Sequence, residues 1–193
     1  MAECEPRWLQ VVGWSNTGKT TLLTLLVQTA RADGQRVAAL KWSHHPVGNA
    51  ESPTDGKDAE RLYAAGARPV FRVGADGWVE LGKERALHQT ASAAPRSPMV
   101  PESLRNHLGT LAVDWVLVEG GRGLPTPKIV LAPRDVPDVA PPVVLWLGHR
   151  PGSGERAGAR PSAHWSPGAA CRLIWDARLD LSAPLERILE RPP

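Results

Sequence analysis

The run Gly13-Trp14-Ser15-Asn16-Thr17-Gly18-Lys19-Thr20 constrains the fold of this chain more than any other feature, because it satisfies the pattern G-x-x-x-x-G-K-[ST]. It follows the apolar run WLQVVGW, which is typical of a buried parallel strand. It precedes TTLLTLLVQTARADG, where apolar residues recur at helical spacing and Gly34 can cap the helix end. The apolar positions are Leu22, Leu23, Leu26, Val27 and Ala30. A strand, this loop and a helix are the setting that a phosphate-binding loop requires.

In such a loop the backbone wraps closely around a phosphate chain, and its N–H groups and the helix N-terminus supply positive partial charge. Lys19 is then expected near the β- and γ-phosphates, with the Thr20 hydroxyl on Mg²⁺. Asn16 suits a position that needs a positive φ. The residues expected to bind a nucleotide here are Gly13, Ser15, Asn16, Thr17, Gly18, Lys19, Thr20 and Thr21.

A nucleotide-bound Mg²⁺ also needs a carboxylate, and the run VDWVLVEGG offers Asp114 and Glu119. Five strand residues at roughly 3.3 Å each separate the two by about 16 Å. Ligands of open parallel sheets bind beyond the carboxyl ends of the strands, so we expect Glu119 and Thr20 to be the metal ligands. Asp114 is then expected at the opposite end of the sheet, as a solvated residue at the strand start.

The remaining runs predict a three-layer α/β/α P-loop NTPase domain with a mainly parallel sheet and a small β-hairpin extension, as a single domain over residues 1–193. PVFRV, GADG and WVEL predict the hairpin, and RVAALKW, KIVLA, PVVLWLG and RLIWD predict further strands. Helices are predicted from Lys57 to Ala65, at ESLRNHLGTLA and at APLERILER. Residues 43–58 and HQTASAAPRSP are expected to be loops, with a flexible loop at 149–170.

The net charge of +3 comes with basic residues that are scattered along the chain, which favours anionic small molecules over nucleic acid. The only two cysteines, Cys4 and Cys171, lie outside any Cys-x-x-Cys or Cys/His cluster, which disfavours a disulfide framework or a cysteine zinc site. No apolar run approaches the roughly 20 residues that cross a bilayer, and the N-terminus lacks a secretory pattern. We therefore expect a cytoplasmic protein with no membrane contact.

Five segments resemble, in order and approximate spacing, the molybdopterin-guanine dinucleotide biosynthesis protein B (MobB) family. They are GWSNTGKTTLL, LKWSHH, GKDAERLYAAGA, VLVEGG and PKIVL, across residues 10–131. The resemblance implies a GTP- and Mg²⁺-binding protein, with weak GTPase activity at most, that is usually dimeric. It also implies a guanylyltransferase partner that joins GMP to molybdopterin, and molybdopterin as a further ligand. Guanine preference comes from the resemblance alone, because the Asn-Lys-x-Asp motif of many GTPases is missing.

The segment after the second predicted strand departs from the family, whose pattern resembles Lys-His-Ser/Thr-His-His followed by an acid. Here it is Lys41-Trp42-Ser43-His44-His45-Pro46, so the first histidine and the acid are replaced. Adjacent histidines point in different directions, which disfavours one metal held by both. We expect one of His44 and His45 to contact phosphate or substrate and the other to bond the loop backbone.

Three further residues match the family and keep two interpretations each. Asp58 either reaches Mg²⁺ through water or orients an attacking water, which would make it catalytic with Lys19 and Glu119, or it stabilises the first turn of a helix. Lys57 either meets an anion or is solvated. Lys128 either stabilises the rim of the site or is solvated. Trp14, inside the loop, either shields the phosphates or meets a neighbouring subunit.

Two other functions fit parts of the sequence. A small-molecule kinase could use HRPGSGERAGAR as an arginine-rich lid, and a metallochaperone GTPase could use His44 and His45. A GTP-binding adaptor is preferred over both. Because no arginine finger or catalytic glutamine can be named, hydrolysis is expected to be slow unless a partner supplies the missing group.

Overall fold

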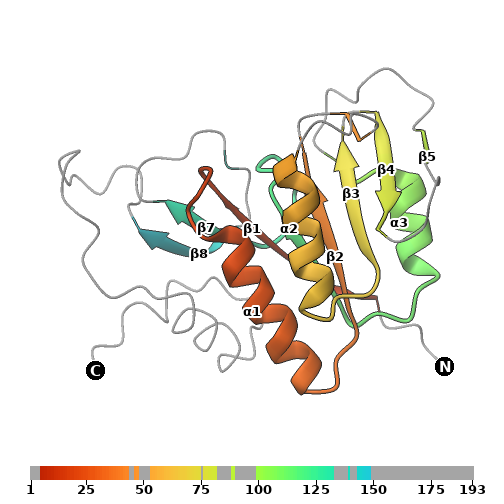
Figure 1. Cartoon of the computed structure of the whole chain (residues 1–193), viewed down its shortest axis with the longest axis horizontal. Helices are drawn as coiled ribbons and strands as arrows, with labels where there is room; N and C mark the ends of the chain where they lie inside the picture. Colours follow the sequence, from red (N-terminus) through yellow and green to blue (C-terminus); the bar gives the residue numbers. More distant parts are fainter. Residues whose placement is uncertain are drawn as a thin grey trace.

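A computed structural model describes residues 5–43, 46–47, 53–74, 76–81, 88–89, 99–132, 139 and 143–148. Within these residues an eight-stranded sheet has the order β5-β4-β3-β2-β6-β1-β7-β8 (Figure 1). The strands are β1 (Arg7–Gly13), β2 (Val37–Trp42), β3 (Val70–Gly74), β4 (Gly77–Glu80), β5 (His88–Gln89), β6 (Trp115–Glu119), β7 (Lys128–Ala132) and β8 (Val143–Gly148). The helices are α1 (Lys19–Ala32), α2 (Pro53–Ala64) and α3 (Glu102–Gly109).

The sheet is mainly parallel, as predicted. The strands from β3 through β2, β6, β1 and β7 to β8 pair in parallel, whereas β4 is antiparallel to both β3 and β5. The β3–β4 hairpin is the one expected at PVFRV and WVEL. The strand β6 lies between β1 and β2, so three strands that are distant in the sequence end side by side.

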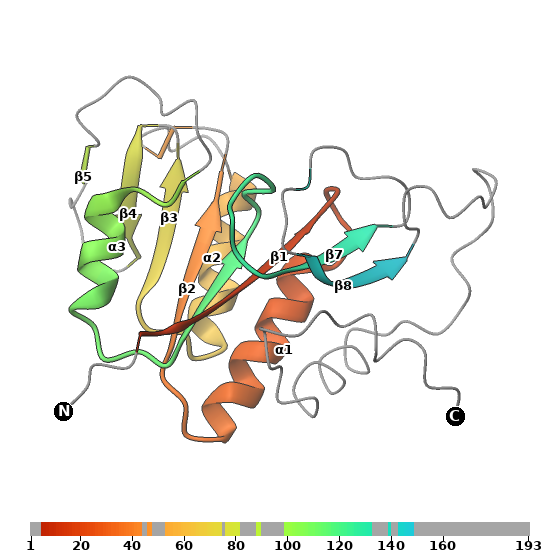
Figure 2. The same ribbon diagram turned by 180° about the vertical axis from the view of Figure 1, so that it is seen from behind.

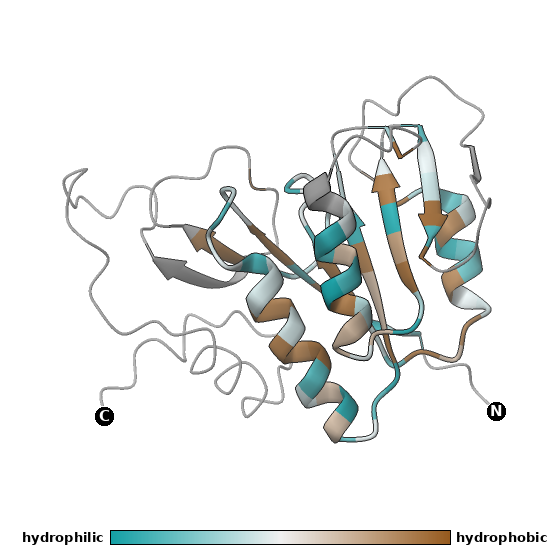
Figure 3. Cartoon of the chain, in the orientation of Figure 1, coloured by the Kyte–Doolittle hydropathy of each residue, from teal (hydrophilic) through white to brown (hydrophobic). Residues whose placement is uncertain are grey.

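Helices cover both faces of the sheet, which confirms the three-layer prediction (Figures 1 and 2). α1 and α2 pack on one face, and α3 packs on the other against Phe71 and Trp78. In Figure 3 the strands that carry colour are mainly hydrophobic, while each helix carries both kinds of residue. All five apolar positions predicted for the first helix are buried: Leu22, Leu23, Leu26, Val27 and Ala30. Gly34 follows the helix at φ 75°, as expected of a residue that ends a helix.

Two boundaries differ from the sequence predictions. α2 begins at Pro53, so part of the expected loop 43–58 is helical. A proline suits the first helical position, since it has no N–H to satisfy and its φ is already helical. His88 and Gln89, expected in a loop, pair with β4 as a short strand. RLIWD, APLERILER and the expected loop 149–170 lie outside the described residues. No helix among the described residues is long and apolar enough to cross a membrane.

Two glycines permit close backbone approaches at the ends of β1 and β6. Gly13 has φ 152°, and a Cβ there would lie 2.2 Å from the carbonyl oxygen of Leu131. Gly120 has φ 87°, and a Cβ would lie 2.8 Å from the carbonyl oxygen of Trp42. A side chain at either position would clash with backbone, so these glycines keep the ends of neighbouring strands together.

Candidate nucleotide-binding site

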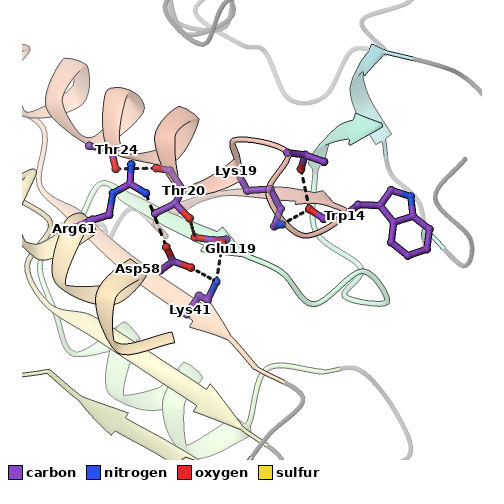
Figure 4. A network of polar contacts seen from close by, with 9 residues as sticks. Trp14, Lys19, Thr20, Thr24, Lys41, Asp58, Arg61 and Glu119 are labelled. Carbon is purple, nitrogen blue, oxygen red and sulfur yellow. Dashed lines mark hydrogen bonds and ion pairs between the residues drawn. The ribbon is translucent and has the colours of Figure 1, made fainter. Parts of the chain in front are cut away.

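The candidate site lies where β1, β6 and β2 end and α1 begins. In the strand register, Glu119 of β6 stands beside Val11 of β1 and Lys41 of β2. The Glu119 side chain is buried, and its Oε2 accepts a hydrogen bond of 2.9 Å from the Thr20 hydroxyl (Figure 4). The structure therefore brings together the hydroxyl and the carboxylate that the sequence predicted as metal ligands.

The loop between β1 and α1 has the backbone that such a cradle needs. Asn16 has φ 61° and Gly18 has φ 88°, so the chain turns twice through the left-handed region, as expected for Asn16. Such turns direct successive N–H groups into one concave surface, which attracts anions. The Thr17 hydroxyl donates to the Trp14 carbonyl oxygen at 2.9 Å and helps to hold the loop closed. Ser15 and Asn16 are exposed at the tip of the loop.

Lys19 lies in the first turn of α1 and donates to the carbonyl oxygen of Trp14 at 2.6 Å. Burial lowers the pKa of Lys19. The carboxylates of Glu119 and Asp58 oppose this effect, and Lys41 adds to it. A lysine held by a neutral carbonyl can turn to a phosphate without breaking an ion pair. The Trp14 ring points away from Lys19 and Thr20 (Figure 4) and packs beside Val12 and Val130.

Lys41 of β2 is the central cation of the site, and its role was not predicted. Its Nζ donates to Glu119 Oε1 at 2.7 Å and to Asp58 Oδ2 at 2.8 Å (Figure 4). Burial desolvates the ammonium and would lower its pKa, but the two carboxylates outweigh this effect and raise the pKa of Lys41. The ammonium therefore stays charged and holds Glu119 with one oxygen toward Thr20.

Asp58 lies in the middle of α2, so the interpretation that it stabilises a first helical turn is wrong. It faces the sheet and bonds Lys41, and Arg61 lies one turn later with NH1 at 4.0 Å from Asp58 Oδ1. The NH2 of Arg61 also donates to the Thr21 hydroxyl at 3.3 Å. Polar contacts thus run from Thr20 through Glu119, Lys41 and the α2 side chains back to the start of α1.

A second polar cluster supports the segment that follows Glu119. Gln10 of β1 is fully buried, donates to the carbonyl oxygens of Gly120 and Gly121, and accepts from the Thr126 hydroxyl at 2.7 Å. Lys128 donates to the carbonyl oxygens of Leu124 and Thr126 at 2.8 and 2.9 Å. Lys128 is fully buried, so its solvated interpretation is wrong and it stabilises the rim. Burial lowers the pKa of Lys128 to about 8.

Other sequence-predicted residues lie apart from this arrangement. Asp114 is at the opposite end of the sheet, as expected, but it forms an ion pair with Arg36 at 3.2 Å and is not simply solvated. Hydrogen bonds from Arg36 lower the pKa of Asp114. Lys57 is exposed on α2, as its solvated interpretation requires. His44 and His45 lie outside the described residues. No group of three or more His, Cys, Asp or Glu in the described parts of the chain is placed to hold a metal ion.

Sequence reasoning missed Lys41, Arg61 and Gln10. For Lys41 and Gln10 a signal was present, because each is a polar residue inside an otherwise apolar strand. A long polar side chain in a buried strand requires a partner. Nothing comparable marked Arg61, which is one of several charged residues on α2.

A sequence comparison decides the family of this chain. The family described as molybdopterin guanine dinucleotide synthesis protein B, MobB, matches residues 8–141. The chain belongs to the MobB family. The match runs from the second residue of β1 past the end of β7 and so includes Lys19, Lys41 and Glu119.

Curated relatives agree with this assignment. A molybdopterin-guanine dinucleotide biosynthesis adapter protein of Haemophilus influenzae is 30% identical over 70% of this chain and 68% of its own. A probable adapter protein of Bacillus subtilis is 32% identical, and the Escherichia coli adapter protein is 30% identical; each match covers 64% of this chain and 63% of the relative. This MobB-family chain therefore spans slightly less than two thirds of those two relatives. A crystal structure of Bacillus subtilis MobB is 30% identical over 65% of this chain and 67% of that one, with a TM-score of 0.37.

Proposed function

We propose that this MobB-family chain binds Mg²⁺-GTP at residues 13–21 and acts as an adapter in the biosynthesis of molybdopterin guanine dinucleotide. The observation that carries the proposal is the 2.9 Å hydrogen bond between Thr20 and Glu119 beside Lys19. It supports a metal-nucleotide site because it joins the hydroxyl of a phosphate loop to a buried carboxylate at the end of a parallel strand. The names of the curated relatives support the adapter role.

The residues present fit a magnesium nucleotide. Thr20 and Glu119 offer two oxygen ligands, and Mg²⁺ in nucleotide sites takes its remaining ligands from phosphates and water. When bound, Mg²⁺ would neutralise phosphate charge. The backbone from Gly13 to Gly18 directs N–H groups to the phosphates, and Lys19 adds a full positive charge. Lys41 orients Glu119 so that one carboxylate oxygen faces Thr20.

The preference for a nucleotide base and the slow rate of hydrolysis are proposed on different grounds. The preference for GTP rests on the family, since no described residue is placed as a base reader by its contacts. Hydrolysis is expected to be slow because Asp58 accepts a hydrogen bond from Lys41 and is therefore not placed as a free general base. Arg61 bonds Thr21 in the first turn of α1, so it is not placed as an arginine finger beyond the end of the phosphate loop. We therefore propose that the chain mainly holds its nucleotide.

The partners proposed for this chain come from the family. They are a guanylyltransferase that joins GMP to molybdopterin, molybdopterin itself and a second copy of the chain. For His44 or His45 we propose contact with phosphate or substrate, because both follow directly after the end of β2, close in sequence to Lys41.

Nucleotide titration tests the proposal. Calorimetry with GTP and ATP, each with and without Mg²⁺, should show Mg²⁺-dependent binding that prefers GTP in the wild-type chain. Lys19→Ala should weaken binding by about a hundredfold, since it removes a charged contact to the phosphates. Lys57→Ala, at an exposed lysine of α2, is the matched control and should bind like wild type. Tight ATP binding with no GTP preference would favour a kinase and contradict the adapter proposal.

A further inference from the structure

A row of charged side chains crosses the ends of three neighbouring strands on the α1 and α2 face. Leu117, Ala39 and Val70 belong to the apolar core of that face. Because side chains alternate along a strand, the residues two positions later point to the same side. They are Glu119 of β6, Lys41 of β2 and Arg72 of β3, and the strand register places Lys41 directly beside each of the other two.

Within the described part of the chain, Arg72 is the member of this row whose side chain has no bonded partner. Glu119 and Lys41 bond each other, and Lys41 also bonds Asp58. The Arg72 Nε is buried from solvent and has no hydrogen-bond partner. Among the described residues, no hydrogen bond or ion pair is formed by the Arg72 side chain. A buried guanidinium nitrogen without a partner is costly, so it points to a group that binds there.

The helix α2 packs over β2 and β3, and so over the strand that carries Arg72. Ala59 and Leu62 mark the buried face of this helix, and Asp58 lies on the flank toward Lys41. Successive helix residues are about 100° apart, which puts Gly56 on the other flank, over β3. A Cβ at Gly56 would meet nothing within 4 Å, so this flank of α2 is open.

From this juxtaposition we infer that Arg72, beside Lys41 and under the open flank of α2 at Gly56, forms a second anion site for the phosphate group of a small molecule. Arginine binds phosphate oxygens through a planar fork of N–H donors. The Lys41 ammonium on the adjacent strand is already bonded to Glu119 and Asp58, so the Arg72 guanidinium supplies the charge that binds the ligand. A dianionic phosphate is attracted to this guanidinium more strongly than a singly charged carboxylate. The site is distinct from the loop 13–20. That loop follows β1, and in the sheet β6 separates β1 from β2 and β3.

The position of this site goes beyond nucleotide binding. Arg72 is two strands from Glu119, or about 10 Å at the spacing of neighbouring strands. A phosphorylated small molecule held there would lie beside a bound nucleotide and would not overlap it. The chain would then hold two anionic ligands at one rim of its sheet.

The test uses the whole chain with Lys19→Ala, which disables the loop 13–20. Inorganic phosphate is titrated at constant ionic strength while the Arg72 Nε–H signal is followed by NMR, the signal being assigned by its loss in Arg72→Lys. A saturable shift is expected, and acetate should produce a smaller one. The same phosphate should raise the thermal unfolding midpoint, and Arg72→Gln should abolish that rise. Arg105→Gln, at an exposed arginine of α3, should preserve it.

Gly56→Met gives an independent variant that leaves Arg72 intact. Its side chain fills the open flank of α2, and replacing a helical glycine tends to stabilise the fold. It should weaken phosphate binding by about tenfold or more, the cost expected when a charge-assisted contact is lost. An absent shift in the Lys19→Ala protein would overturn the inference. So would phosphate binding in Arg72→Gln or Gly56→Met that is as strong as in the Lys19→Ala parent. Since the nucleotide loop is already disabled, such a result leaves GTP binding by the wild-type chain unaffected.

Discussion

Lys41 Nζ lies 2.7 Å from Glu119 Oε1, across two strands that are neighbours in the sheet although the residues are 78 positions apart. The same ammonium reaches Asp58 of α2 at 2.8 Å, so a buried cation joins two carboxylates. A buried charge loses hydration and is stable only when it is paired and hydrogen-bonded. This ion pair therefore links the magnesium-site candidate Glu119 to the position of α2.

Lys41→Met should lower the free energy of unfolding by about 3 kcal/mol, because it leaves buried carboxylate charge without its partner. Urea denaturation followed by circular dichroism measures the change. Lys57→Met, at an exposed lysine of α2, should change stability by about 0.5 kcal/mol or less. Equal effects of the two substitutions would show that the ion pair does not support the fold.

Glu119→Gln should remove the Mg²⁺ dependence of nucleotide binding, because the amide is a poorer metal ligand and carries no charge. Affinity for GTP with Mg²⁺ should fall by about tenfold or more, and affinity without Mg²⁺ should change little. Asp114→Asn makes the same chemical change at the other end of the sheet and should leave both affinities unchanged. A similar loss in both variants would contradict the role of Glu119.

Trp14→Ala tests whether nucleotide binding depends on the side chain of Trp14 or only on its backbone. Lys19 bonds the Trp14 carbonyl oxygen, which any residue provides, while the ring points away from Thr20 (Figure 4). Nucleotide affinity measured by calorimetry should therefore change by less than about threefold, or under 1 kcal/mol. A loss as large as that of Lys19→Ala would mean that the indole covers the phosphates.

The parts of the fold that the sequence predicted are those with local signals. The helix after the loop 13–20 was predicted together with its five buried apolar positions, because apolar residues recur there at helical spacing. The start of α2 was missed because its first residues include Pro53 and Gly56, which are common in loops as well as at helix starts. A proline alone does not distinguish these two cases.

In the candidate site, too, the residues that were predicted are those with a local sequence signal. Thr20 and Glu119 were predicted because a loop motif and the end of a strand each mark one position. Lys41 and Asp58 were not paired in advance, because their contact depends on β2 lying next to β6 and on the placement of α2. Strand order is a property of the assembled sheet, so no local pattern reveals which side chains it brings together.

Gly120→Ala should destabilise the chain more than Gly34→Ala does. Both glycines have a left-handed backbone, at φ 87° and 75°, which costs an alanine about 1 kcal/mol or more. Only at Gly120 would the new Cβ also meet a backbone atom, the Trp42 carbonyl oxygen at 2.8 Å. The difference between the two variants in urea denaturation should be about 2 kcal/mol. No difference would show that the ends of β2 and β6 separate easily.

Lys128 should make stability depend on pH in the alkaline range. Burial lowers its pKa to about 8 from its ordinary value of 10.5, so the unfolded chain binds more protons between these values. Stability contributed by Lys128 therefore rises as pH increases from about 8 to about 10.5. The total rise is about 3 kcal/mol, because each pKa unit corresponds to about 1.4 kcal/mol. Urea denaturation at several pH values should show this rise in wild type relative to Lys128→Met, which lacks the titrating group. A constant difference across the range would mean that the folded chain keeps Lys128 protonated through its bonds to the Leu124 and Thr126 carbonyl oxygens.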